Sequence, residues 1–288
     1  MNKFYLIDKP LDVTSFDVIR ILRKKLNTSK MGHTGTLDPL ATGGLLVAVG
    51  NYTKLIPYFE KDTKEYVFTV NLDGVSPSFD LGTQVEFISS EAQKIAKESI
   101  TNEKIEKLLN LNFTGKISQI PPKYSALKMG GKKALDKIRS GEEFEMKARE
   151  VTIKDIELLD FSYPSATIRA VVSAGTYIRS IAYDLGDMLG TGGYVTKLRR
   201  TKIGSLDISF GQNLDEFDAT KSFDIKELFK KKSFITLPND VLQKINNGLI
   251  VEQKFDLEIG VDLFVYDGEN ITNIVEYDGE KLFAKRKI

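Results

Sequence analysis

Residues 30–49 read Lys30-Met31-Gly32-His33-Thr34-Gly35-Thr36-Leu37-Asp38-Pro39-Leu40-Ala41-Thr42-Gly43-Gly44, followed at once by the apolar run Leu45-Leu46-Val47-Ala48-Val49. The composition changes at Gly44 from a loop rich in Gly and Thr to a run typical of a buried strand. Glycines allow the backbone to approach a ligand closely, and Pro39 stiffens the chain after Asp38. This stretch therefore predicts a chemically important loop that is anchored on a core strand.

His33 and Asp38 are the residues of this loop that can carry chemistry. Asp before Pro is a common turn former, and a single histidine, the only one in the chain, can simply bind a backbone carbonyl. For these two residues alone, a structural role is the better interpretation. The whole string from Gly32 to Gly43, however, resembles the catalytic motif of the TruB family of tRNA pseudouridine synthases. The resemblance implies an isomerase that acts on the T-arm uridine at tRNA position 55, with Asp38 as nucleophile and His33 as a substrate-binding residue.

The composition narrows the possible functions. The 288 residues are 41% hydrophobic, enough for a sizeable core, and 41 Lys and Arg against 40 Asp and Glu give a net charge of +1. Nucleic-acid binding would therefore depend on local basic patches. The absence of cysteine excludes thiol nucleophiles and thiolate metal sites, and a single histidine excludes a His-rich metal site. The isomerisation that the resemblance implies requires no metal and no cofactor, so we expect neither. No apolar run has the length of a membrane span or a signal peptide, which favours a cytoplasmic protein.

The segments before the loop predict a strand and a basic helix. The strand, Phe4–Ile7, ends at Asp8-Lys9-Pro10, and a helix with a basic outer face follows Thr14. Lys9 by itself would be interpreted as a solvated lysine at a strand end. Its Asp-Lys-Pro context resembles the N-terminal motif of the TruB family, which implies that Lys9 lies near the catalytic loop and binds substrate.

Three predictions concern the segment that follows the loop. Residues 63–72 alternate as a strand, and periodicity alone makes Tyr66 an ordinary strand aromatic. The resemblance implies instead that Tyr66 is a catalytic residue that stacks on the target base. Residues 75–82 correspond to a stretch that carries two acidic positions in the TruB family. Asp80 matches the later acid, whereas the earlier acid is absent here, so we assign no role to that earlier position. Residues 91–112 predict a helix.

The strongest charge asymmetry lies between Lys116 and Arg139, where seven basic residues accompany one acid. Glycines beside lysines, with Tyr124 nearby, suit a segment that grips a phosphate backbone, although such charge runs are often merely solvated. Residues 113–145 resemble the RNA-binding insertion, or thumb, of TruB enzymes. We therefore predict RNA backbone contacts from the following lysines of this segment: Lys123, Lys128, Lys132 and Lys133.

A second motif, Gly175-Thr176-Tyr177-Ile178-Arg179, lies at a glycine turn between a predicted strand and a predicted helix. It resembles the second signature of these synthases, in which the arginine pairs with the nucleophilic aspartate. A guanidinium beside Asp38 would keep the carboxylate ionised and fix its orientation. We therefore predict that Arg179 is catalytic and that Tyr177 lines the base pocket.

A third motif resembling the family lies at residues 192–201. Here Leu198 corresponds to an apolar wall of the base pocket and binds substrate. Two basic residues follow it, Arg199 and Arg200, and we interpret both as solvated surface residues.

The resemblance implies an α+β fold. The resemblance implies the pseudouridine synthase fold, a large mixed and mainly antiparallel sheet flanked by helices, over residues 1–232. From residue 233, a short helix and hairpins around Asp267-Gly268 and Asp278-Gly279 resemble the RNA-binding PUA module, so we predict a small β-rich domain at 233–288. Guided synthases of the dyskerin type lack a thumb, which favours a stand-alone monomer that binds tRNA and requires no protein partner.

Two other functions are compatible with parts of the sequence. A carboxylate-dependent hydrolase could use Asp38, but a glycosidase needs a second carboxyl group, and no motif supplies one beside it. A non-catalytic RNA-binding or tRNA-folding protein would keep the basic stretches without needing the pair of Asp38 and Arg179. Isomerisation of uridine involves no net oxidation, so it requires a nucleophile and an extruded base rather than a cofactor. The three ordered motifs favour the isomerase.

Overall fold

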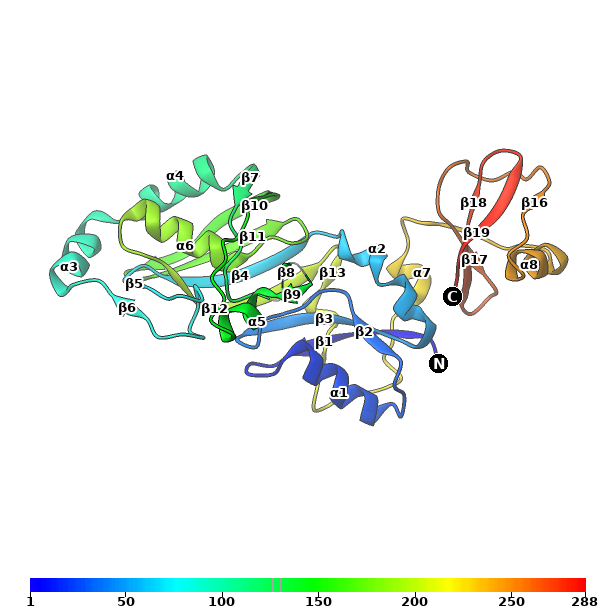
Figure 1. Ribbon diagram of the computed structural model, residues 1–288, viewed down its shortest axis with the longest axis horizontal. Helices are drawn as coiled ribbons and strands as arrows, with labels where there is room; N and C mark the ends of the chain where they lie inside the picture. Colours follow the sequence, from blue (N-terminus) through cyan, green and yellow to red (C-terminus); the bar gives the residue numbers. More distant parts are fainter. Residues whose placement is uncertain (126, 130) are drawn as a thin grey trace.

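The computed structural model describes residues 1–125, 127–129 and 131–288, apart from the side chains of residues 128, 129, 132, 133 and 135. Figure 1 shows an elongated molecule in which one large sheet with its helices is followed by a small sheet at the C-terminal end. The fold is therefore α+β, as predicted.

The large sheet is mixed and mainly antiparallel, which confirms the prediction. Within the described residues, β14 runs parallel to β1 and β12 runs parallel to β3, while the remaining neighbours are antiparallel. In spatial order the strands are β14 (Gln212–Asn213), β1 (Lys3–Lys9), β3 (Ala41–Val49), β12 (Tyr194–Ile203), β4 (Lys64–Asn71), β11 (Ser165–Val172), β10 (Arg149–Ser162) and β7 (Gly115–Gln119), with β2 (Met31–His33) on β3 and β13 (Leu206–Asp207) on β12.

Helices and two small strand pairs fill the connections. The helices are α1 (Ser15–Lys25), η1 (Gly50–Leu55), α2 (Pro57–Glu60), α3 (Ser90–Ser99), α4 (Asn102–Asn112), α5 (Ala134–Arg139), α6 (Ile178–Leu189), η2 (Ile208–Phe210), α7 (Ile225–Leu228) and α8 (Asn239–Asn246). The strand pairs are β5 (Gly74–Val75) with β6 (Glu86–Phe87), and β8 (Lys128–Met129) with β9 (Lys132–Lys133). The segment predicted to be helical, 91–112, is helical in two pieces, because Thr101 caps α4 through its side chain after α3 has ended at Ser99.

Close backbone packing joins the predicted catalytic loop to the centre of the sheet. Gly43 has φ of +103°, and a Cβ atom built on it would lie 2.2 Å from the carbonyl oxygen of Arg200 on the neighbouring strand. A side chain at this position would force β3 and β12 apart. The glycine therefore fixes the loop that carries Asp38 against β12.

An apolar cluster on one face of the sheet supports the second predicted motif. Phe68 and Val70 of β4 pack in the same cluster as Ile181 and Leu185 of α6. Figure 1 shows α4 and α6 on this face of the sheet. Tyr66 packs against the same cluster at its edge, so the face that forms the core also presents the tyrosine.

The C-terminal sheet shares a core with the large one. Its strands, in the order β15 (Ser233–Ile235), β17 (Leu263–Tyr266), β18 (Ile271–Tyr277), β19 (Lys281–Lys287) and β16 (Val251–Glu252), pack with α8. Phe264 and Ile274 belong to one buried cluster with Phe4 and Phe59 of the large domain. This β-rich end of the chain agrees with the predicted fold class, whereas the domain boundary at residue 232 stays a prediction.

The predicted thumb contains β8, β9 and α5. Lys123 is exposed, whereas the side chains of Lys128, Lys132 and Lys133 lie outside what the structure describes, so the backbone contacts predicted from them stay predictions. Across the described part of the chain, no helix has the length and apolar character needed to cross a membrane.

Candidate active site

The loop that carries Asp38 is held on both sides by backbone contacts. Before the aspartate, the hydroxyl of Ser15 accepts from the N–H of Leu37 at 2.8 Å and donates to its carbonyl at 3.0 Å. After it, the N–H of Ala41 donates to the carbonyl of Asp38 at 3.0 Å, and the carbonyl of Pro39 accepts from the N–H of Asp12. Two flanking segments thus determine where the Asp38 carboxylate points.

Lys9 lies beneath this loop and does not face a substrate. It is fully buried, and its ammonium donates to the carbonyls of Pro10, Val13 and Pro39 at 2.9, 2.6 and 3.2 Å. Burial lowers its pKa to about 8, and the nearby charge of Asp38 opposes that shift. The interpretation of Lys9 as a solvated lysine is wrong, because its side chain is buried. The prediction that Lys9 binds substrate directly is wrong too, because its ammonium already donates to three backbone carbonyls. Lys9 instead holds the segment that follows Asp38.

Arg179 connects Asp38 to two other segments. Its side chain is only 4% exposed, and its Nε lies 3.0 Å from Oδ2 of Asp38. Nη1 donates to the carbonyl of Ser78 at 2.8 Å and lies 3.4 Å from Oδ2 of Asp80, while Nη2 donates to the carbonyl of Tyr124 at 3.0 Å. The guanidinium therefore has little freedom to rotate, and it presents a fixed positive charge to the carboxylate.

The electrostatic balance at Asp38 is set by burial and by two charged neighbours. Burial raises the pKa of Asp38 above its ordinary value, Arg179 opposes this shift, and the like charge of Asp80 adds to it. The side chain is nonetheless 37% exposed, so one part of the carboxylate remains accessible from the adjacent cavity. A carboxylate that is partly desolvated, oriented and accessible is suited to nucleophilic attack.

A cavity of about 310 Å³ opens beside Asp38. Its volume lies within the range of small-molecule sites. Tyr66, Tyr177 and Leu198 line it together with Asp38 and Arg179, so the structure brings these five predicted site residues together. A second, smaller cavity of about 90 Å³, lined mainly by apolar residues, lies on the side of Asp38 where Asp80 is found.

Tyr177 is positioned by a buried glutamine. The side-chain oxygen of Gln119 accepts from the backbone N–H of Tyr177 at 2.8 Å, and its amide nitrogen donates to the carbonyl of Tyr177 at 3.0 Å. Arg149 lies over the Tyr177 ring, with Cζ 4.7 Å from the ring centre. The end of β7 and the start of β10 therefore fix the tyrosine at the N-terminus of α6.

His33 and Arg200 stand at the back of the site. His33 is not among the residues that line the larger cavity, and burial together with the charge of Arg200 lowers its pKa, so its imidazole is neutral at neutral pH. Arg200 is fully buried and donates to the carbonyls of Gly44 at 2.7 Å and Gly35 at 3.0 Å. The interpretation of Arg200 as a solvated surface residue is wrong, because it binds the two ends of the catalytic loop.

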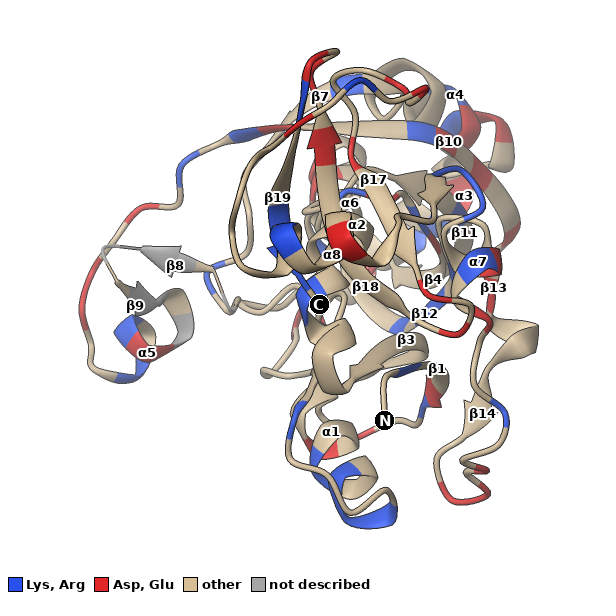
Figure 2. Ribbon diagram, turned by 90° about the vertical axis from the view of Figure 1, so that its right-hand side faces the viewer, with Lys and Arg blue, Asp and Glu red and all other residues tan. Residues whose placement is uncertain are grey.

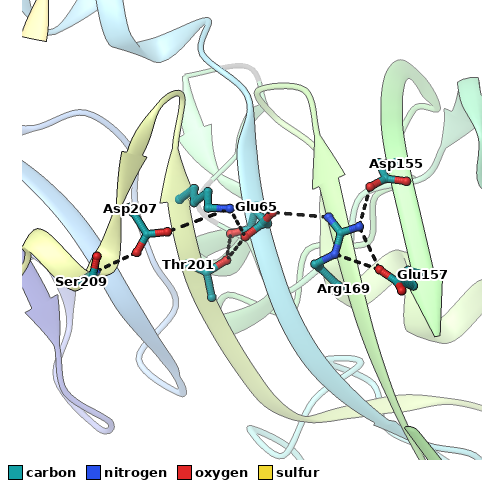
Figure 3. A network of polar contacts seen from close by, with 8 residues as sticks. Glu65, Asp155, Glu157, Arg169, Thr201, Asp207 and Ser209 are labelled. Atoms are coloured by element: carbon teal, nitrogen blue, oxygen red, sulfur yellow. Dashed lines mark hydrogen bonds and ion pairs between the residues drawn. The ribbon is translucent and has the colours of Figure 1, made fainter. Parts of the chain in front are cut away.

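The opposite face of the sheet carries a network of ion pairs. Arg169 on β11 contacts Glu65 of β4 and the carboxylates of Asp155 and Glu157 on β10, and Glu65 also contacts Lys202 of β12. Figure 3 shows these contacts extending across the neighbouring strands. Because Glu65 precedes Tyr66, the network fixes β4 from one face while Tyr66 lies on the other.

The polar groups of the site include no evident metal centre. Among the residues that the structure describes, no three His, Cys, Asp or Glu side chains are grouped so that they could hold a metal ion. The absence of a metal requirement therefore stays a prediction, to be tested with a chelator.

Comparison with protein families shows the family of this chain. The model of the TruB family pseudouridylate synthase N-terminal domain matches residues 23–178, which include the whole catalytic loop and Tyr177. This chain belongs to the TruB family. The model of the tRNA pseudouridylate synthase B C-terminal domain matches residues 179–233. This TruB-family chain is therefore a pseudouridine synthase, an isomerase.

Curated relatives support the same assignment. The chain is 42% identical over 217 residues to a tRNA pseudouridine synthase B of Parabacteroides distasonis, covering 73% of this chain and 89% of that protein. It is 34% identical over 300 residues to a tRNA pseudouridine synthase B of Francisella philomiragia, covering 99% of this chain and 94% of that protein. The resemblance to TruB enzymes found in the sequence is thereby confirmed.

A solved structure supports the fold over nearly the entire chain. It is the H/ACA RNP bound to a substrate RNA containing 2′-deoxyuridine, with a TM-score of 0.69 and 19% identity over 99% of this chain and 84% of the matched one. At this identity the likeness concerns the TruB-family fold alone.

Sequence reasoning missed four polar residues of this TruB-family site. Gln119, Arg149 and Arg200 gave no signal in the sequence, because their partners are backbone atoms or rings of distant segments. Asp80 could have been found, since it is the acid retained in the altered stretch 75–82. It holds the side of Arg179 that faces away from Asp38, which makes it a positioning residue.

Proposed function

We propose that this chain converts uridine 55 in the T arm of tRNA into pseudouridine, with Asp38 as the nucleophile. The observation that carries the proposal is the ion pair of Asp38 with the buried Arg179, at 3.0 Å, beside a cavity lined by Tyr66, Tyr177 and Leu198. The names of the curated relatives, which are tRNA pseudouridine synthases, support tRNA as the substrate. We further propose that the protein acts as a monomer in the cytoplasm.

The target base must leave its stacked position before the reaction. Extrusion costs a few kcal/mol, which contacts in the cavity must offset. Tyr66 supplies an aromatic ring for stacking, and Leu198 supplies an apolar wall of the same cavity. Tyr177, fixed by Gln119, encloses the base from a third side. His33, which is neutral, steadies the flipped nucleotide from outside the cavity.

The chemical step then proceeds from a defined carboxylate. Asp38 attacks the nucleotide and forms a transient bond to it, and the C1′–N1 bond breaks. The uracil rotates, C5 bonds to C1′, and the bond to Asp38 is released. C5 then loses its proton and N1 gains one, which gives pseudouridine and free Asp38. Arg179 keeps Asp38 ionised and oriented against the pKa rise caused by burial. The product has the same composition as the substrate, so no oxidant or reductant enters.

The two other functions weighed from the sequence are less well supported. A hydrolase would need a second carboxyl group that acts on the bound nucleotide. Asp80 contacts Arg179 and does not line the larger cavity, and Glu60, which does line it, belongs to none of the three motifs. A non-catalytic RNA-binding protein would have no use for the buried Arg179 held by three segments.

The test compares wild-type protein with Asp38→Asn on unmodified tRNA. Pseudouridine is mapped by chemical adduct formation and primer extension. We expect a single modified position, 55, in the wild-type reaction and none with Asp38→Asn, while tRNA affinity changes by no more than a few-fold, since the amide preserves the side-chain shape but is no nucleophile. Added chelator should leave the rate unchanged.

The matched control is Asp155→Asn, which removes a carboxylate from the polar face of the sheet. It should retain the wild-type rate. Appreciable product from Asp38→Asn would overturn the assignment of the nucleophile, and product at another uridine would overturn the assignment of the target.

A further inference from the structure

A basic groove lies between the large domain and the C-terminal sheet, outside the cavity described above. It has a volume of about 880 Å³ and is bordered by α2 and the turn after it, by residues 228–232 and by β19. Six basic residues line it: Lys61, Lys154, Lys230, Lys231, Lys232 and Arg286. Figure 2 looks onto this end of the molecule and shows basic positions on β19 and near α7.

The lining of the groove is much more positively charged than the chain as a whole. Its lining has six basic residues against two acids, Asp62 and Asp262, while the whole chain has a net charge of only +1. Asp262 is already occupied, because it accepts from the hydroxyl of Tyr58 at 2.8 Å and pairs with Lys285 at 2.7 Å. Asp62 interacts with Lys231 and Lys232, so the lining keeps an excess of positive charge over its two acids.

Four lysines of the groove have no ion pair within the part of the chain that the structure describes. Among the described residues, no carboxylate lies within ion-pair distance of the following lysines: Lys61, Lys154, Lys230 and Lys231. All four lysines are exposed. On the polar face of the sheet, by comparison, Arg169 has three acidic partners. Unpaired lysines gathered in a concave surface are suited to a polyanion, because each can replace a counterion of a phosphate.

The floor of the groove is rigid. Phe59 and Phe229 pack edge to face with ring centres 4.8 Å apart, and both belong to the shared core of the two domains. The turn after α2 is held by the buried Lys64, whose ammonium donates to the carbonyls of Phe59, Glu60 and Asp62. The basic side chains thus project from a preformed surface, which reduces the ordering cost of binding.

The same turn connects the groove to the catalytic cavity. Glu60 and Lys64 line the cavity, while Pro57 to Phe59 and Lys61 to Thr63 line the groove. The turn thus separates the two hollows, so an RNA with its target nucleotide in the cavity would have to extend past this turn to occupy the groove. Figures 1 and 2 show α5 of the predicted thumb away from α7.

We propose that this groove binds the phosphate backbone of the substrate RNA outside the stem-loop that carries the target uridine. The inference rests on the proposed function, since it requires an RNA substrate that extends beyond its T arm. Lysine contacts of this kind position an RNA without reading its sequence. The groove therefore distinguishes a whole tRNA from an isolated stem-loop by size rather than by base sequence.

The test uses the full chain with Lys61→Gln, Lys230→Gln and Lys231→Gln combined. Affinity for unmodified full-length tRNA and for an isolated T-arm stem-loop is measured over a range of salt concentrations. Each lost phosphate contact removes about 0.7–0.9 from the slope of log K against log salt, so the triple variant should lose about two units of slope with full-length tRNA. Its affinity for that tRNA should fall by roughly 10- to 50-fold at physiological salt, whereas affinity for the stem-loop should stay within about two-fold.

The matched control neutralises three exposed lysines on α3 and α4, namely Lys94, Lys97 and Lys107. It should leave both slopes at the wild-type value. An unchanged slope with full-length tRNA, or an equal loss on the stem-loop, would overturn the proposal. Product mapping with the wild-type protein is scored separately: no pseudouridine at position 55 would refute the proposed function, while the slopes would still decide whether the groove binds RNA.

Discussion

Replacing Arg179 with methionine should cost about two orders of magnitude in the chemical step. Unit charges 3.0 Å apart, the distance from Nε of Arg179 to Oδ2 of Asp38, attract each other by about 5.5 kcal/mol at an effective dielectric constant of about 20. Because the Asp38 side chain is 37% exposed, solvent screening reduces this to roughly 3 kcal/mol. At about 1.36 kcal/mol for each factor of ten, the single-turnover rate constant should fall about 100-fold at neutral pH.

The pH dependence of the same variant tests the cause of the loss. Asp38 must be ionised to attack, and burial already raises its pKa while Arg179 opposes the rise. Without Arg179 the pKa rises further, so activity is lost at a higher pH as the solution is acidified, and part of the rate returns at alkaline pH. The rate constant is measured under single-turnover conditions with saturating enzyme across the pH range.

The control for this experiment is Arg169→Met, which removes an arginine with several ion pairs from the opposite face of the sheet. It should leave both the rate and the acid limb of the profile unchanged. If Arg179→Met lost activity without any displacement of the acid limb, the guanidinium would not act through the ionisation of Asp38. An equal loss from Arg169→Met would indicate general damage to the sheet.

Three further variants test neighbouring contacts. Asp80→Asn removes a negative charge that raises the pKa of Asp38, so the acid limb of the pH–rate profile should move to lower pH. A shift of that limb to higher pH would contradict this. Lys9 has a pKa of about 8 in the folded protein and about 10.5 in the unfolded chain, so between these pH values the unfolded chain binds the extra proton. The free energy of unfolding of the wild type should therefore rise with pH over that interval, by up to about 3 kcal/mol relative to Lys9→Met. Urea denaturation of both proteins at several pH values measures this difference. Gln119→Leu leaves the backbone N–H and carbonyl of Tyr177 without their partner and should cost about 2–4 kcal/mol of stability by the same method, together with a slower reaction at saturating RNA.

The sequence was most informative where a motif coincides with local backbone chemistry. The change from glycine-rich loop to apolar run predicted the strand that follows Asp38, and the structure has β3 there. The motif around Arg179 predicted its proximity to Asp38, which the 3.0 Å contact shows. These predictions succeeded because each depends on a short segment and one partner.

Buried cations were the main failure of sequence reasoning. A lysine or arginine in a polar stretch is usually solvated. The Asp-Lys-Pro motif placed Lys9 near the catalytic loop without indicating that it is buried, and nothing next to Arg200 in the sequence indicated burial. Their partners are backbone carbonyls, some more than 150 residues away, as for Arg200 and Gly35. Carbonyl acceptors are present at every residue, so they leave no trace in the amino-acid pattern, and only the folded backbone shows which ones converge.

The core shared by the two sheets has a consequence for how the protein is made. Phe4 enters the nascent chain about 270 residues before Ile274, yet both belong to one buried cluster. At roughly 5–20 residues per second, the ribosome adds the later residue some 15–50 seconds after the earlier one. During most of that interval the aromatic rings that are already made and will contact the C-terminal sheet, Phe4 and then Phe59, lack their final cover. Chaperone binding at this exposed apolar surface should therefore persist until translation is almost finished, and slow codons placed after residue 232 should prolong it.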